Sequence, residues 1–148
     1  IATKSSASSK AKMLSTTADG AHLKTTSHMT ISDGSVILPE NLPSDAAVFD
    51  VEQGISAGTF ALKEINNGYL YGAYDADHTI NTLSFKDKKD ASASWYISID
   101  SKSSAANAYA YYNNTEYRYL NNNFGSKFNF VNVLSKDSYY YIYYIDGK

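Results

Sequence analysis

The densest group of side chains that could take part in chemistry is Tyr74, Asp75, Asp77 and His78. Two carboxylates separated by one residue can offer oxygen ligands to Ca²⁺. The Gly and the distal Glu that an EF-hand loop needs are missing, however, and Asp residues in such a stretch commonly bond their own backbone in polar turns. We therefore expect no metal here and treat the four residues as candidates for contact with a ligand.

A second candidate group consists of Tyr117 and the run Asn121, Asn122 and Asn123. Tyrosine presents a rigid, amphipathic surface at little entropic cost, and Asn carries both the donors and the acceptors that sugar hydroxyls require. These residues favour a shallow binding surface on loops, with a glycan as the expected ligand. Trp95 lies in an alternating strand pattern, so we assign it to the core rather than to sugar stacking.

Catalysis is not indicated by the residue types present. The histidines are His22, His28 and His78, and none stands in a recognisable nucleophile or acid–base pattern. Cysteine is absent, which removes thiol nucleophiles, disulfides and thiolate metal sites. We expect a chain that is not an enzyme and that uses no cofactor.

Charge and hydropathy exclude two classes of partner. Lys and Arg total 13 against 15 Asp and Glu, the net charge is −2, and Arg118 is the single arginine. A nucleic-acid partner is not expected, because such binding needs a basic stripe. No apolar run approaches the roughly 20 residues of a membrane-spanning helix. The expected state is a monomer that does not enter a membrane.

The sequence predicts short β-strands as the elements that position these side chains. Phe49, Trp95 and Tyr141 each stand in an alternating strand and are 46 residues apart (49 to 95 and 95 to 141). A second series, Leu23, Leu70 and Leu120, recurs after 47 and 50 residues. Such a period indicates three degenerate repeats.

The fold predicted from these repeats is an all-β domain spanning 1–148, a β-trefoil with repeats at about 1–53, 54–101 and 102–148. One four-stranded unit cannot bury its own apolar face, whereas three units can close a six-stranded barrel. Phe49, Trp95 and Tyr141 are expected at equivalent positions inside it. A two-sheet β-sandwich is the alternative, because short strands with regular turns suit it too.

Several short sequence segments resemble those of a known repeat module. Gly68-Tyr69-Leu70-Tyr71-Gly72-Ala73 precedes Ser94-Trp95-Tyr96-Ile97-Ser98-Ile99, and Tyr117-Arg118-Tyr119-Leu120-Asn121 precedes the closing Tyr139-Tyr140-Tyr141-Ile142-Tyr143. They resemble a β-trefoil-like repeat module attached to secreted or surface proteins of gut bacteria. The Gln-x-Trp motif of ricin-type sugar-binding trefoils is absent, so that family's sugar site does not carry over.

The resemblance implies an accessory domain cut from a longer exported protein, located outside the cell or on its surface. Combined with the Tyr, Asn and Asp candidates, it favours a non-catalytic module that binds a glycan. The alternative is a protein-interaction or spacer domain of a surface protein, with another surface protein as partner.

Overall fold

The computed structural model describes residues 1, 11–27, 36–37, 39–75, 77, 80–102, 105–112, 116–121, 127–131 and 140–145. Strands and two 3₁₀ turns make up its regular structure, so the all-β prediction is confirmed. The strands are β1 (Leu14–Asp19), β2 (His22–Thr25), β3 (Val36–Ile37), β4 (Phe49–Gln53), β5 (Phe60–Glu64), β6 (Gly68–Asp75), β7 (Ile80–Lys86), β8 (Tyr96–Ile99), β9 (Ala106–Tyr112), β10 (Glu116–Asn121), β11 (Lys127–Val131) and β12 (Tyr144–Ile145). The 3₁₀ turns are η1 (Pro39–Asn41) and η2 (Ala91–Ala93).

Local sequence explains the tightest hairpin, β5–β6. Glu64 pairs with Gly68, and Asn66 and Asn67 lie in the turn between them. Gly68 has φ +90°, a backbone conformation that glycine adopts without steric cost. A Cβ atom at this position would also meet the carbonyl oxygen of Lys86 on β7. The Asn-Asn-Gly sequence therefore fixes where β5 ends and β6 begins.

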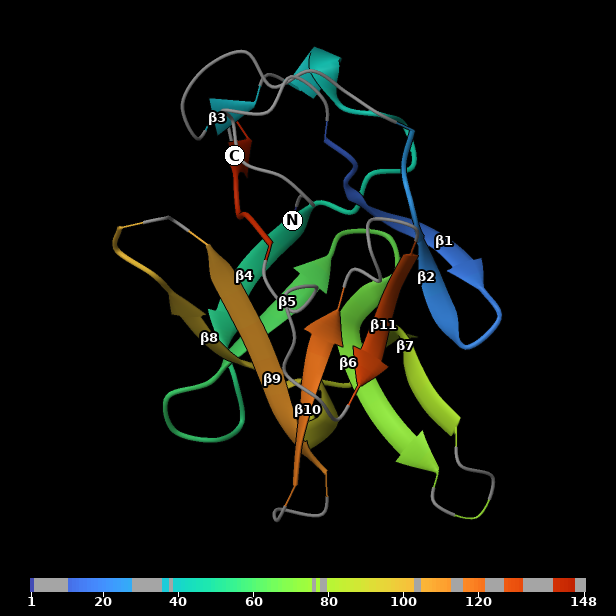
Figure 1. Cartoon of the computed structure of the whole chain (residues 1–148), viewed down its shortest axis with the longest axis vertical. Coiled ribbons are helices and arrows are strands. Elements are labelled where there is room, and N and C mark those ends of the chain that lie inside the picture. Colours follow the sequence, from blue (N-terminus) through green and yellow to red (C-terminus); the bar gives the residue numbers. More distant parts are fainter. Residues whose placement is uncertain are drawn as a thin grey trace.

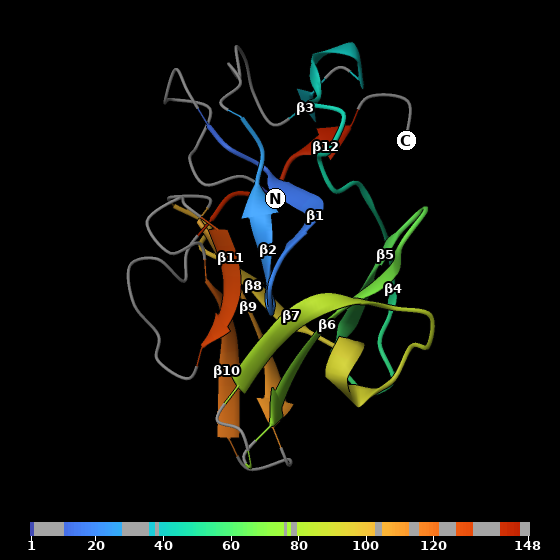
Figure 2. The same cartoon turned by 90° about the vertical axis from the view of Figure 1, so that its right-hand side faces the viewer.

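The strands form three sheets. A six-stranded sheet has the order β1-β2-β11-β10-β9-β8, a four-stranded sheet has the order β4-β5-β6-β7, and β12 pairs in parallel with β3. Figures 1 and 2 show β3 and β12 at one end of the molecule, while the β6–β7 and β9–β10 hairpins extend toward the other. These ladders alone also fit the packed sheets of the sandwich alternative.

Trp95 lies at the centre of the main core and is fully buried. Its indole N–H donates to the carbonyl oxygen of Leu70 at 2.9 Å, and its ring meets Phe130 edge-on with centroids 5.6 Å apart. The ring of Phe130, on β11, lies against Gly72, on β6, where a Cβ would be 2.6 Å from it. Glycine at this position therefore allows the four-stranded and six-stranded sheets to pack closely.

Both repeat series can be compared with the observed burial. Leu23, Leu70 and Leu120 are all buried. In the other series only Trp95 is fully buried. Phe49 is partly buried against the core, and Tyr140 rather than Tyr141 occupies the interior. The prediction for Tyr141 was wrong by one residue, because successive side chains of an extended strand point to opposite faces.

Candidate functional site

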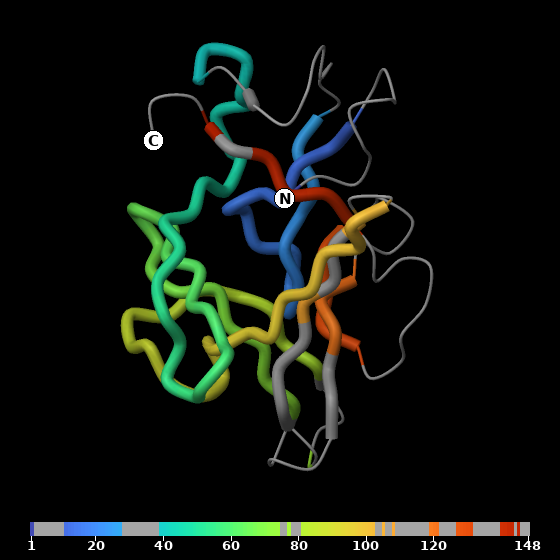
Figure 3. The backbone as a smooth tube through the Cα atoms, turned by 90° about the vertical axis from the view of Figure 1, so that its left-hand side faces the viewer, coloured from blue at the N-terminus to red at the C-terminus, as the bar shows by residue number. Residues whose placement is uncertain are grey.

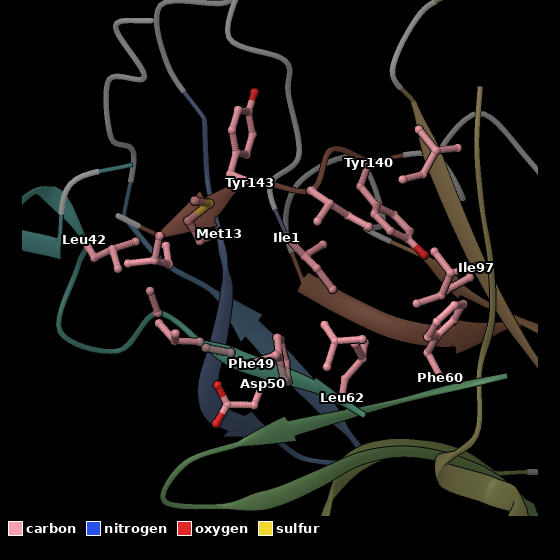
Figure 4. A pocket seen from close by; sticks show the side chains of 18 residues that line it. Ile1, Met13, Leu42, Phe49, Asp50, Phe60, Leu62, Ile97, Tyr140 and Tyr143 are labelled. Carbon is pink, nitrogen blue, oxygen red and sulfur yellow. The ribbon is translucent and has the colours of Figure 1, made fainter. Parts of the chain in front are cut away.

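An apolar pocket of about 670 Å³ lies in the described part of the chain. Its walls come from Ile1 and Met13 ahead of β1, from the segment ending in β4, and from β5, β8, β9 and residues 140–145. Figure 3 shows β4 and β5 on one side and β8 on the other, with the 140–145 segment crossing above. In the close view of Figure 4, Met13, Phe49, Leu62, Ile97 and Tyr140 surround the same space.

Exposed apolar side chains stand around the pocket. Val51 is 63% exposed, Ile99 59%, Phe60 43% and Ile142 36%, and all four belong to its lining. Scattered exposed apolar residues are ordinary, but a group gathered around one concave space is typical of an interaction site. Its volume also lies within the range of small-molecule sites in proteins, roughly 300–1,000 Å³.

Tyr140 forms part of the pocket wall without exposing its hydroxyl group. Its hydroxyl points toward Ile97 in Figure 4 and has no partner in hydrogen-bond geometry among the described residues. Burial raises the pKa of this hydroxyl well above its ordinary value, against a smaller lowering by the Ala108 backbone. Tyr140 therefore stays neutral at physiological pH, and it belongs to the apolar wall.

A second, smaller hollow of about 240 Å³ adjoins the first and is more polar. Ser44, Asp50, Glu64 and Asn66 contribute to its lining. Glu64 is only 4% exposed, and its Oε2 accepts hydrogen bonds from the backbone N–H groups of Asn66 and Asn67 at 3.0 and 2.8 Å. The Asn67 side-chain amide donates to the same oxygen at 2.6 Å. One carboxylate oxygen thus holds the β5–β6 turn.

Lys86, at the end of β7, and Lys89, in the turn after it, are held by acidic neighbours. Lys86 pairs with Asp90 at 2.6 Å, and its ammonium lies 4.8 Å from the centroid of the Tyr71 ring. Lys89 lies 3.7 Å from Glu52. Burial alone would raise the pKa of Asp90, but hydrogen bonds from Lys86 and Ser92 outweigh it, so this pKa lies below its ordinary value.

The predicted binding residues fall partly within the described chain. Tyr74 and Asp75 end β6, Asp77 is exposed in the following turn, and Tyr117 lies near the start of β10. Asn121 ends β10 opposite Asn129 and is only 6% exposed, which leaves little of its amide for a ligand. His78, Asn122 and Asn123 lie outside the described residues.

None of these predicted residues lines either hollow. The C-terminal end of β6 and the start of β10 lie toward the same end of the molecule in Figures 1 and 2. Asn121, the last residue of β10, lies at the opposite end of that strand. Within the described ranges, no three His, Asp or Glu side chains group closely enough to hold a metal ion. No helix there is long and apolar enough to cross a membrane.

The sequence did not reveal the pocket because its lining residues are scattered along the chain, from Ile1 to Ile145. One feature of the sequence did point to this pocket. The strands that contain Phe49 and Ile97 each carry a further apolar residue two positions on, Val51 and Ile99. Side chains two apart share a face of a strand, so each strand continues its apolar face beyond the core.

Comparison of the chain with models of known protein families, with curated proteins and with solved structures finds no match.

Proposed function

We propose that this chain is a non-catalytic binding module, built as a β-trefoil whose barrel opens at one end into the apolar pocket. The observation that carries the proposal is the pocket of about 670 Å³ with exposed apolar side chains around it. The ligand is apolar over most of its surface, because the hydrophobic effect favours covering those side chains.

The trefoil is supported by how the strands divide. In the described parts of the three predicted repeats, the strands divide as β1–β4, β5–β8 and β9–β12, four in each. Antiparallel bridges join the first and last strand segments of two repeats, Ser15 to Ala46 and Phe60 to Trp95. The one pocket is lined by residues of β4, β5, β8, β9 and β12 and by Met13, just before β1, as expected for a six-stranded barrel with an open end.

A binding role rather than catalysis is supported by the side chains that line the pocket. Among the described lining residues, the ionisable side chains are those of Asp50, Tyr140 and Tyr143, with no histidine or lysine. General acid–base catalysis relies on two groups oriented toward one reacting centre. A single exposed carboxylate beside a buried, neutral Tyr140 suits binding better.

Calorimetric titration with butylbenzene, a neutral apolar probe, tests this function. We expect saturable one-to-one binding. Ile99→Glu should weaken it about tenfold, because a ligand covering Ile99 gains about 1–2 kcal/mol of apolar burial. Ile55→Glu is the matched control, since Ile55 is 61% exposed and lies outside both hollows. Absence of binding by the folded wild type, or equal loss in both variants, would reject the pocket as the site.

Glycan recognition through Tyr74, Asp77 and their neighbours stays a prediction, as do the surface-protein resemblance, the location outside the cell and the monomeric state. A specific observation also bears on the protein-interaction alternative, because exposed apolar side chains such as Val51 and Phe60 can contact an apolar side chain of a protein partner. Titration with soluble glycans separates the two surfaces. Glycan binding that Asp77→Asn weakens and Ile99→Glu leaves intact would assign the ligand to the loops.

A further inference from the structure

The apolar pocket and the polar hollow adjoin one another. They share five lining residues, which are Leu42, Ala46, Val48, Asp50 and Ile145. A molecule long enough to pass this shared wall would meet apolar side chains at one end and the carboxylates of Asp50 and Glu64 near the other. The two hollows together thus match an amphiphile rather than a uniformly apolar ligand.

Glu64 supplies an unused acceptor in the polar hollow. Its three hydrogen bonds, from the backbone of Asn66 and from the backbone and side chain of Asn67, all end on Oε2. No described residue donates to Oε1, although the side chain is more than nine-tenths buried. Oε1 is not among the fully buried side-chain atoms that lack a partner, so it remains accessible, and a cationic ligand can donate a charge-assisted hydrogen bond to it.

The charge in this region is unbalanced. Among the described residues, no lysine, arginine or histidine side chain lines either hollow. Lys63 is the cross-strand neighbour of Asp50, but its ammonium lies over the ring of Tyr69, 5.7 Å from the centroid. Asp50 and Glu64 therefore present negative charge with no basic side chain among the described lining residues, which favours a cation and disfavours an anion.

We propose that the ligand is a single-chain amphiphile with a cationic ammonium head. Its alkyl chain lies in the apolar pocket, and its ammonium group donates to Oε1 of Glu64 close to Asp50. The assignment rests on the proposed function, because the apolar pocket must first accept an alkyl chain. Beyond the proposed function, the assignment states that the polar hollow selects the charge of the head group.

Calorimetry with three ligands of equal chain length, octylammonium, octan-1-ol and octanoate, tests the assignment. We expect octylammonium to bind about tenfold more tightly than octan-1-ol, because hydrogen bonds to charged groups are stronger than neutral ones. Octanoate should bind least tightly. Raising the salt concentration to about 1 M should reduce the preference for octylammonium, since salt screens partly exposed charges.

Variants separate this assignment from the proposed function. Asp50→Asn and Glu64→Gln should each reduce the ratio of octylammonium to octan-1-ol affinity about threefold or more. Asp50 is exposed, so its variant keeps the test open if loss of the Glu64 turn contacts unfolds the chain. Asp87→Asn is the matched control, because Asp87 is exposed and outside both hollows.

Two results would refute the assignment of a cationic head group and still leave the apolar pocket as the binding site. One is octan-1-ol binding as tightly as octylammonium, and the other is octanoate binding most tightly. If neither octan-1-ol nor butylbenzene binds the folded protein, the proposed function itself fails. A ratio that falls equally in Asp50→Asn and Asp87→Asn would also count against the assignment, because a general loss of negative charge would then explain it.

Discussion

Replacing Trp95 with Phe tests how the core is held together. The indole is fully buried, and its N–H donates to the Leu70 carbonyl oxygen at 2.9 Å. Phe cannot donate, so the carbonyl loses its partner in a dry environment, at a cost of about 1–3 kcal/mol. The smaller ring also leaves a gap beside Phe130 that we put at about 1–2 kcal/mol, below the cost of removing a whole ring. The expected loss of stability is about 3 kcal/mol.

Urea unfolding followed by far-UV circular dichroism measures this loss. At this chain length it corresponds to a fall in Tm of roughly 10 °C. Tyr71→Phe is the control, because it removes a hydroxyl from a half-buried ring outside the core cluster and should change stability by less than about 0.5 kcal/mol. A Trp95→Phe loss below about 1 kcal/mol, with an unchanged urea dependence, would refute the dry, hydrogen-bonded indole.

Two further predictions concern the β5–β6 turn and the charged turn after β7. Gly68→Ala should cost about 3 kcal/mol in urea unfolding, since it combines positive φ with a clash on the Lys86 carbonyl oxygen. Gly20→Ala, at φ +60° with open space around it, should cost only about 1 kcal/mol, and equal costs would contradict the clash. Because the folded pKa of Asp90 is lowered, its stabilisation is present above the unfolded value of about 3.9 and is lost as pH falls through the folded value. The Tm deficit of Asp90→Asn should therefore be full at pH 6 and shrink toward pH 2, and a deficit independent of pH would contradict the role of the charge.

The sequence was informative where one residue type repeats in one environment. Leu23, Leu70 and Leu120, which marked the three repeats in the sequence, are all buried in the structure. The aromatic series was less informative at the C-terminal strand. Residues 139–145 read Tyr-Tyr-Tyr-Ile-Tyr-Tyr-Ile, and such a run has no polar alternation to mark which face is buried. Tyr140 was therefore missed by one position.

The candidate site could not be found from the sequence, for a different physical reason. Val51, Phe60 and Ile99 look like core residues by type, and only the arrangement of the strands leaves them exposed around one space. Glu64 looks like an ordinary surface acid, and its burial follows from the Asn66–Asn67 turn folding back onto Oε2. Exposure of apolar groups and burial of a charge are tertiary properties that residue types alone do not carry.

The position of Trp95 has a spectroscopic consequence. The protein has a single tryptophan, it is fully buried, and it is not part of the wall of either hollow. Its emission therefore reports the loss of the core to solvent, while an occupant of the pocket does not touch the indole directly. Intrinsic fluorescence can accordingly follow unfolding in the presence of any of the alkyl ligands without a contribution from quenching by the ligand itself.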